Sequence, residues 1–195
     1  MTYYKLIPLS LALACFYSSA YSDSQWNAFL QVPTEHRLLE LKKDIPPARN
    51  TCADSTLPNP AEAIRLIGLV SGGNELSFRA GLLISHCLGV GDLEDFYRAS
   101  GAFLDLHPKA FLRIVTSSAL PEHTVRDMVT MLPLTLVDNY RGTLMAIDKR
   151  IATVKAVDDP LLNDIKAKIV TSLQDEKLEL ETIESDRTRG NNREH

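Results

Sequence analysis

The sequence lacks most of the features by which a function is recognised. It contains no HExxH, GxSxG or CxxC motif and no P-loop, so the usual signatures of zinc proteases, serine hydrolases, thiol oxidoreductases and nucleotide hydrolases are missing. A basic excess is also missing, because 21 basic and 25 acidic residues give a net charge of −4. This mild acidity argues against nucleic acid or an anionic membrane as the partner.

Long hydrophobic runs are scarce, and the one clear run lies near the N-terminus, from Leu6 to Phe16. It is about half of the roughly 20 residues that a membrane-spanning helix needs, which disfavours a transmembrane anchor. Lys5 precedes the run, and the small residues Ser18-Ser19-Ala20 follow it. We interpret residues 1–20 as a signal peptide and expect a periplasmic or secreted protein without a membrane span after cleavage.

A second route of export is possible. Leu13-Ala14-Cys15 loosely resembles a lipobox, in which Cys15 would be acylated and become the mature N-terminus. Ala12 stands where a lipobox prefers leucine, and the cleavage site after Ala20 is the better one. A lipoprotein anchored at Cys15 is therefore the less favoured alternative.

Cysteine is rare, with only three residues in the chain. Cleavage after Ala20 removes Cys15 and leaves Cys52 and Cys87, and an even pair in an oxidising compartment predicts a disulfide. The alternative is a reactive Cys87 thiol beside His86. Consecutive side chains on a helix point about 100° apart, so adjacency in sequence does not by itself create an activated pair.

Strand patterns are few, whereas helix boundaries are frequent, so the fold class predicted is all-α in one domain over residues 21–184. Asn59 and Pro60 start one helix, and Asp92 is expected to cap another. The helix expected at 75–88 is apolar nearly all round, so we expect it at the centre of the core, with Gly89-Val90-Gly91 as its end. A compact multi-helix bundle and a short HEAT-like stack of helix pairs are both open. The helices expected before residue 133 are 26–41 with a break at Pro33, 60–70, 75–88, 93–106, 108–118 and 121–132.

The C-terminal part predicts a long antiparallel helix hairpin. Apolar residues repeat every three or four positions from Val137 to Val154, and again from Leu162 to Ile183, on either side of Asp158-Asp159-Pro160. We expect this hairpin to pack on the domain core, although a homodimer through helices 134–183 is the alternative. The polar residues 185–195 are expected to form a disordered tail.

Candidate catalytic and ligand residues are few. Acidic residues crowd the predicted helix 93–106, but an acidic first turn also stabilises a helix dipole. His107 and His123 each flank a helix start, and no third ligand is placed beside them by spacing, so we expect no metal and no cofactor. The residues considered are Asp92, Glu94, Asp95 and Asp105 for acid–base chemistry, and Asp138, Asn139, Tyr140 and Arg141 as a polar cluster.

Two functions are consistent with this sequence. The favoured one is an exported helical protein without catalysis of its own, which inhibits, protects or helps to assemble another protein in the periplasm or outside the cell. The alternative is a hydrolase-type enzyme that uses the acidic residues around Asp92–Asp105, and it requires those side chains to converge in one cleft.

Overall fold

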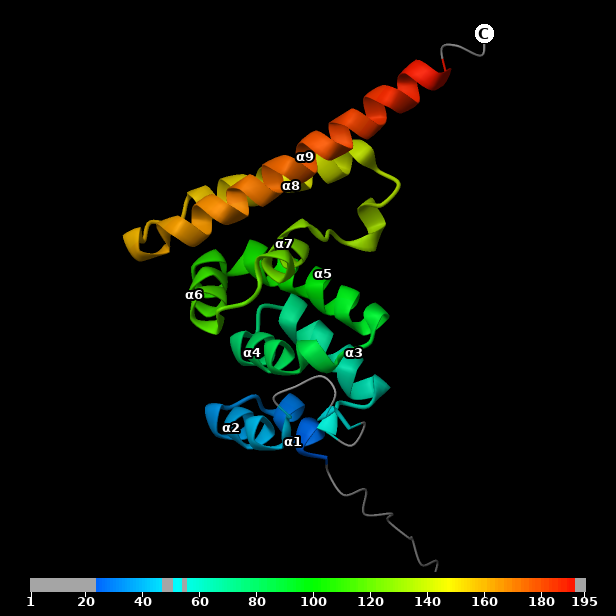
Figure 1. The fold of residues 1–195 in the computed structure, drawn as a ribbon. Coiled ribbons are helices and arrows are strands. Elements are labelled where there is room, and N and C mark those ends of the chain that lie inside the picture. The colour runs from blue at the N-terminus through cyan, green and yellow to red at the C-terminus, as the bar shows by residue number, and fades with distance from the viewer. Residues whose placement is uncertain (1–23, 47–50, 54–55, 192–195) are drawn as a thin grey trace, which may run out of the picture.

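The computed structural model describes the backbone of residues 24–46, 51–53 and 56–191 (Figure 1). Every regular element in these segments is a helix, so the all-α prediction is confirmed for the described chain. The predicted signal peptide, residues 1–20, lies outside it. The helices are α1 (Gln25–Gln31), α2 (Glu35–Asp44), α3 (Pro60–Ser71), α4 (Glu75–Ile84), α5 (Val90–Leu106), α6 (Pro108–Ser118), α7 (Glu122–Thr130), α8 (Tyr140–Lys155) and α9 (Asn163–Asn191), with short 3₁₀ helices η3 (Ser85–Cys87), η4 (Leu134–Leu136) and η5 (Pro160–Leu162).

The helices follow one another along the molecule in layers (Figure 1). Consecutive helices pair as α1 with α2, α3 with α4 and α5 with α6, and α3 lies between α1 and α5. Helix α2 also contacts α4, while α8 and α9 form the layer at the other end. None of the helices in the described segments is both long and apolar enough to cross a membrane.

The predicted start of α3 is confirmed in detail. The Asn59 side chain accepts hydrogen bonds from the backbone N–H groups of Ala61 and Glu62, and the Glu62 carboxylate accepts one from the Asn59 N–H at 2.9 Å. Pro60 occupies the first helical position, where no backbone hydrogen bond is lost. This capping box fixes the start of the helix that links the first and third layers.

Replacing the cap should therefore destabilise the protein by a modest amount. We expect Asn59→Ala to lower the free energy of unfolding by about 1 kcal/mol, because two N–H groups lose their acceptor. Asn59→Ser should retain most of the stability, since a serine oxygen can cap the same groups. Urea denaturation followed by circular dichroism measures both, and equal stability of the alanine and serine variants would contradict the capping role.

The start of α5 differs from the prediction that Asp92 caps it. The helix begins at Val90, and Gly89 is its N-cap with an extended backbone conformation. The Gly89 carbonyl accepts the first helical bond, from Leu93 N–H at 2.9 Å, so Asp92 lies inside the first turn. The segment Gly89-Val90-Gly91, expected to end the preceding helix, therefore begins the next one, because α4 already ends at Ile84.

The centre of the core is aromatic. Phe78 of α4 stacks on the rings of Phe96 and Phe103 from α5 and of Phe111 from α6, and all four side chains are buried. A Cβ atom at Gly81 would lie 2.1 Å from the Phe96 ring, so only glycine allows this approach. The sequence prediction that α4 lies at the core is confirmed for this face of the helix.

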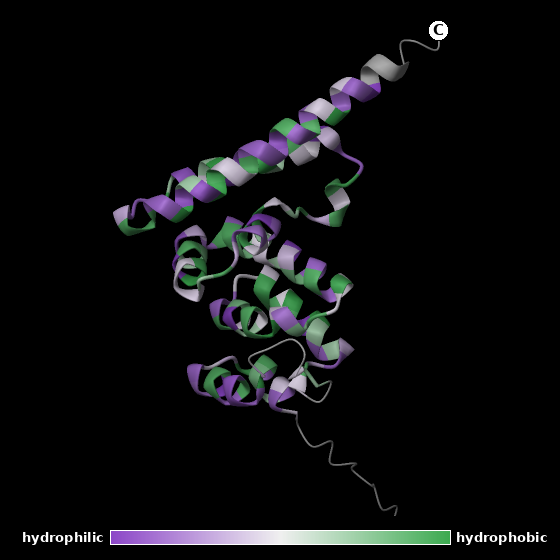
Figure 2. Cartoon of the chain, viewed as in Figure 1, coloured by the Kyte–Doolittle hydropathy of each residue, from purple (hydrophilic) through white to green (hydrophobic). Residues whose placement is uncertain are grey.

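The predicted hairpin is present, since α8 packs against α9 through buried apolar residues. The Lys177 ammonium donates to Asp148 across the two helices at 2.7 Å. Hydrophilic and hydrophobic residues alternate along α9 in Figure 2, as expected of a helix with one packed face. Helix α9 also contacts α7, so the hairpin packs on the core as predicted, and the homodimer stays a prediction.

The C-terminal tail differs from its prediction. Residues 185–195 were expected to be disordered, but α9 continues to Asn191 and extends beyond α8 (Figure 1). Helical hydrogen bonding propagates at little cost once a helix is formed, which explains how a polar segment continues it. Residues 192–195 lie outside the described chain.

The hairpin turn is held to α6 by charge. The Asp159 carboxylate accepts a hydrogen bond from Arg113 at 3.0 Å and lies 3.4 Å from the Lys109 ammonium. The Arg113 hydrogen bond and the nearby Lys109 charge lower the pKa of Asp159, although burial opposes them. These two contacts of Asp159 hold the turn between α8 and α9 against the first half of α6.

Candidate functional site

A groove of about 640 Å³ runs between α2, α4 and α6, and we refer to it as the α2–α4–α6 groove. Each of the three helices turns one side toward it, and the start of the segment after α2 closes one end. Its lining residues are Leu38, Leu39, Lys42, Ile45, Pro46, Arg79, Leu82, Leu83, His86, Ile114, Ser117, Ser118 and Leu120.

The walls of this groove are mostly apolar. Leu39 of α2 is 54% exposed, and Leu82 and Leu83 of α4 are only half-buried, although Phe78 and Ile84 of the same helix are buried in the core. Apolar side chains that gather in a concave surface without being covered commonly mark an interaction site. The sequence contained a signal for this groove, because apolar residues lie on more faces of α4 than the core covers.

The charged groups in the groove are of one sign. Lys42 and Arg79 line it together with His86, and the described lining contains no carboxylate. Arg79 is paired outside the groove with Glu35, whose side chain is 62% exposed. The α2–α4–α6 groove thus offers apolar walls with a basic edge, although the protein as a whole is acidic.

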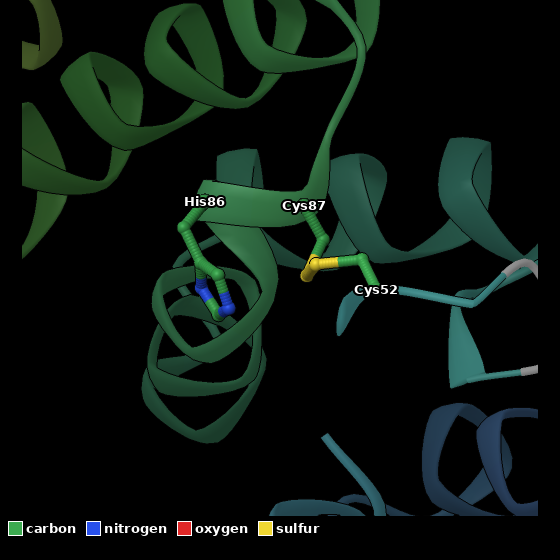
Figure 3. A group of neighbouring side chains, drawn as sticks. All are labelled: Cys52, His86 and Cys87. Carbon is green, nitrogen blue, oxygen red and sulfur yellow. A yellow bond between two sulfur atoms is a disulfide. The ribbon is translucent and has the colours of Figure 1, made fainter. Parts of the chain in front are cut away.

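The predicted disulfide between Cys52 and Cys87 is present, next in the chain to His86, which lines the groove (Figure 3). Its Cα atoms are 5.7 Å apart, within the usual range for a disulfide. The neighbouring His86 ring contacts the Pro46 carbonyl oxygen through Nε2 at 2.9 Å. The bond and this contact fasten the segment after α2 to the end of α4.

The position of His86 differs from the prediction. His86 and Cys87 were expected as neighbours on one helix, whereas α4 ends at Ile84 and η3 carries both residues. A His86 ring nitrogen and the Sγ atoms of Cys52 and Cys87 lie within 4.8 Å of one another (Figure 3). All three side chains are half-buried, so solvent reaches the cluster.

The acidic residues considered for catalysis are not brought together. Asp92 and Asp105 lie at opposite ends of α5, about 20 Å apart at the helical rise of 1.5 Å per residue. Asp105 is bound to Arg150, and Arg98 pairs with both Glu94 and Asp95. Glu94 and Asp95 therefore share one arginine, Asp105 binds another, and Asp92 lies at the far end of the helix, so the four carboxylates do not converge on one substrate position.

The two histidines also lie apart from any such cluster. The His107 ring packs against Phe103 and is otherwise exposed, and His123 lies exposed in the first turn of α7. Neither belongs to the group of potential metal ligands found in the described residues, which consists of Cys52, His86 and Cys87. The three-ligand cluster thus involves a different histidine from those that the sequence singled out.

A second cavity of about 500 Å³ lies between the hairpin, α5 and the connection before α8. It includes Asp138 and Tyr140 from the polar cluster that the sequence predicted, and it places them beside Arg98 and Glu176. Charges of both signs meet here, and Arg98 is already paired within α5. This cavity therefore shows a weaker preference for one kind of ligand than the α2–α4–α6 groove.

The sequence reasoning missed a buried charge. Arg150 of α8 is 1% exposed, and its guanidinium donates to both oxygens of Asp105, at 3.0 and 2.8 Å, and to the Val129 carbonyl at 2.6 Å. The signal was present, because Arg150 lies three residues after Ile147 and four before Val154 on the apolar stripe. These bonds join α8 to α5 and to the end of α7.

Comparisons with known proteins find no matching family model, and no similar curated protein or solved structure. The function is therefore inferred from the residues of this chain, which form layered helix pairs, a disulfide just after α4, and an apolar groove with a basic edge.

Proposed function

We propose that this protein is exported and acts by binding another protein, which it inhibits, protects or helps to assemble, and that the α2–α4–α6 groove is its binding surface. The observation that carries the proposal is the uncovered apolar wall of Leu39, Leu82 and Leu83 beside Lys42. Burial of such side chains by a partner stabilises a complex at about 25 cal/mol for each Å² of apolar surface.

The arrangement of the helices supports this role. We infer that the pairs α1–α2, α3–α4 and α5–α6 form a short HEAT-like stack, in which the second helix of each pair lines the groove. Stacked helix pairs present extended surfaces of this kind to their partners. The surface is built on regular helices, which hold its side chains in fixed positions.

The chemistry of the groove also defines its partner. Leucine and isoleucine walls fit apolar side chains, and Lys42 favours a carboxylate at the edge. We therefore propose an acidic, amphipathic segment of a partner protein as the occupant. The hydrolase alternative has less support, because Asp92 and Asp105 lie at opposite ends of α5.

A matched pair of variants tests the proposal. Leu39→Glu places a negative charge in the groove, whereas Ile64→Glu changes a side chain on α3 that is 73% exposed and lies outside it. We expect affinity purification from native envelope extract with wild type to recover one partner, whose affinity is then measured by calorimetry. Leu39→Glu should weaken the affinity for this partner at least about tenfold, which corresponds to about 1.4 kcal/mol, and Ile64→Glu should weaken it by less than about twofold.

A charge reversal adds a second test of the same surface. Lys42→Glu should weaken the complex, and the loss should be smaller at high salt because the interaction at the groove edge is electrostatic. If wild type recovers no specific protein, or if Leu39→Glu and Ile64→Glu bind the partner equally well, the groove is not the binding surface. Far-UV circular dichroism shows whether each variant is folded.

A further inference from the structure

Cys52, His86 and Cys87 place two sulfur atoms and an imidazole nitrogen together from two segments of the chain (Figure 3). Two cysteines and one histidine are a ligand set that zinc prefers. Ligand atoms on one tetrahedral zinc ion lie about 3.5–3.8 Å apart. The three atoms here lie within 4.8 Å of one another. Once the disulfide is reduced, the two sulfur atoms must move apart to this spacing, and the histidine nitrogen must move closer to them by roughly 1 Å.

The hydrogen bond of His86 leaves one nitrogen of its ring available for such a role. A carbonyl oxygen only accepts hydrogen bonds, so Nε2 carries the proton that bonds the Pro46 carbonyl. In the neutral imidazole this leaves Nδ1 with the free electron pair. Histidines that bind metals typically donate their other ring N–H to a carbonyl or carboxylate in this way.

We propose that, when the disulfide is reduced, Cys52, Cys87 and His86 bind a zinc-like divalent cation in its place, with water as the fourth ligand. A dithiol supplies the two electrons and two protons that convert the disulfide into two thiols, and is itself oxidised to a disulfide. Both thiols then lose their protons to the solvent and bind the cation as thiolates. The proposal goes beyond the protein-binding role and does not depend on it.

The oxidised and metal-bound forms exclude each other, because the same two sulfur atoms make either bond. Each form links residue 52 to residue 87 and so closes the same loop. A cation bound only by the folded, reduced protein stabilises it by mass action. The reduced protein should therefore recover with zinc part of the thermal stability that it loses with the disulfide.

Cobalt(II) provides the direct measurement, because thiolate-bound cobalt shows charge-transfer and d–d absorption bands. The protein is reduced with a dithiol, freed of it by gel filtration without oxygen, and titrated with cobalt and then with zinc in competition. We expect about one cobalt ion for each reduced chain, with bands typical of thiolate ligands and four-coordinate geometry. The oxidised protein should show neither.

Variants separate this site from adventitious binding. His86→Ala should weaken cobalt binding at least about tenfold, Cys52→Ser should abolish the thiolate pattern, and His123→Ala, which changes an exposed histidine elsewhere, should leave both unchanged. Reduced protein without the charge-transfer bands would overturn the proposal. So would equal binding by His86→Ala, or a reduced chain that is unfolded and does not regain helical circular dichroism when cobalt is added.

Discussion

Arg150→Met is expected to lower the free energy of unfolding by about 3 kcal/mol, because it removes one partner of a buried ion pair. The Arg150 side chain is only 2% exposed, and its guanidinium makes two hydrogen bonds to Asp105 and one each to the carbonyls of Val129 and Met131. Methionine fills much of the same volume, so the loss measures the charge and its hydrogen bonds more than a cavity.

The surroundings of Arg150 leave little room for an alternative arrangement. A Cβ atom at Gly101 would lie 2.9 Å from Arg150 Nη1 and 3.0 Å from the Met128 carbonyl oxygen, so glycine is what admits the guanidinium beside α5. The Asp105 side chain is 33% exposed and regains some hydration in the variant. For that reason the expected loss lies at the low end of the range for buried pairs.

Denaturation in guanidinium chloride, followed by circular dichroism, measures the loss in the free energy of unfolding of Arg150→Met. Lys149→Met is the matched control, because Lys149 is the exposed neighbour on the same helix, and it should change stability by less than about 0.5 kcal/mol. Asp105→Asn should cost less in the Arg150→Met background than in wild type, since the two share one interaction. A loss below about 1 kcal/mol for Arg150→Met would show that the pair does not stabilise α8 on the core.

Those parts of the fold that depend on local chemistry were predictable from sequence. Asn59 and Pro60 define the start of α3 because capping and the fixed φ of proline act within a few residues. The C-terminal hairpin followed from two apolar stripes joined at Asp158-Asp159-Pro160, since each stripe needs the other to be buried. The disulfide followed from counting the cysteines of a chain that we predict to be exported.

The parts that were missed depend on contacts between distant segments. Asp92 looked like a helix cap, but the backbone at Gly89 was already extended and started the helix earlier. Asp105 looked like a catalytic acid, and only the packing of α8 on α5 shows that it neutralises Arg150. The apolar pattern of α4 indicated burial by neighbours on several sides, whereas Leu82 and Leu83 line a groove that α2 and α6 leave open. No periodicity within one helix records which neighbours will cover it.

Loss of the disulfide is the second large effect that we expect. The bond closes a loop between residues 52 and 87, a separation of 35 residues, and so restricts the unfolded chain. Replacing both cysteines by alanine should lower the free energy of unfolding by about 3–4 kcal/mol on the chain-entropy model. The disulfide is one of two attachments between the segment after α2 and the end of α4. Without it, only the hydrogen bond between His86 and the Pro46 carbonyl holds the two together.

Chemical reduction of the disulfide provides the control for the cysteine replacements. A dithiol, with a chelator present to remove metal ions, should lower the denaturation midpoint of wild type to near that of the Cys52→Ala/Cys87→Ala variant. It should leave the variant unchanged, because the variant has no bond to reduce. If wild type is equally stable with and without the dithiol, although thiol titration shows two new thiols, the cross-link does not stabilise the fold. If the dithiol instead lowers the stability of wild type alone, the disulfide itself is the source of that stability, because only wild type has the bond to lose. The link between the segment after α2 and the end of α4 would then be a main source of stability at the groove.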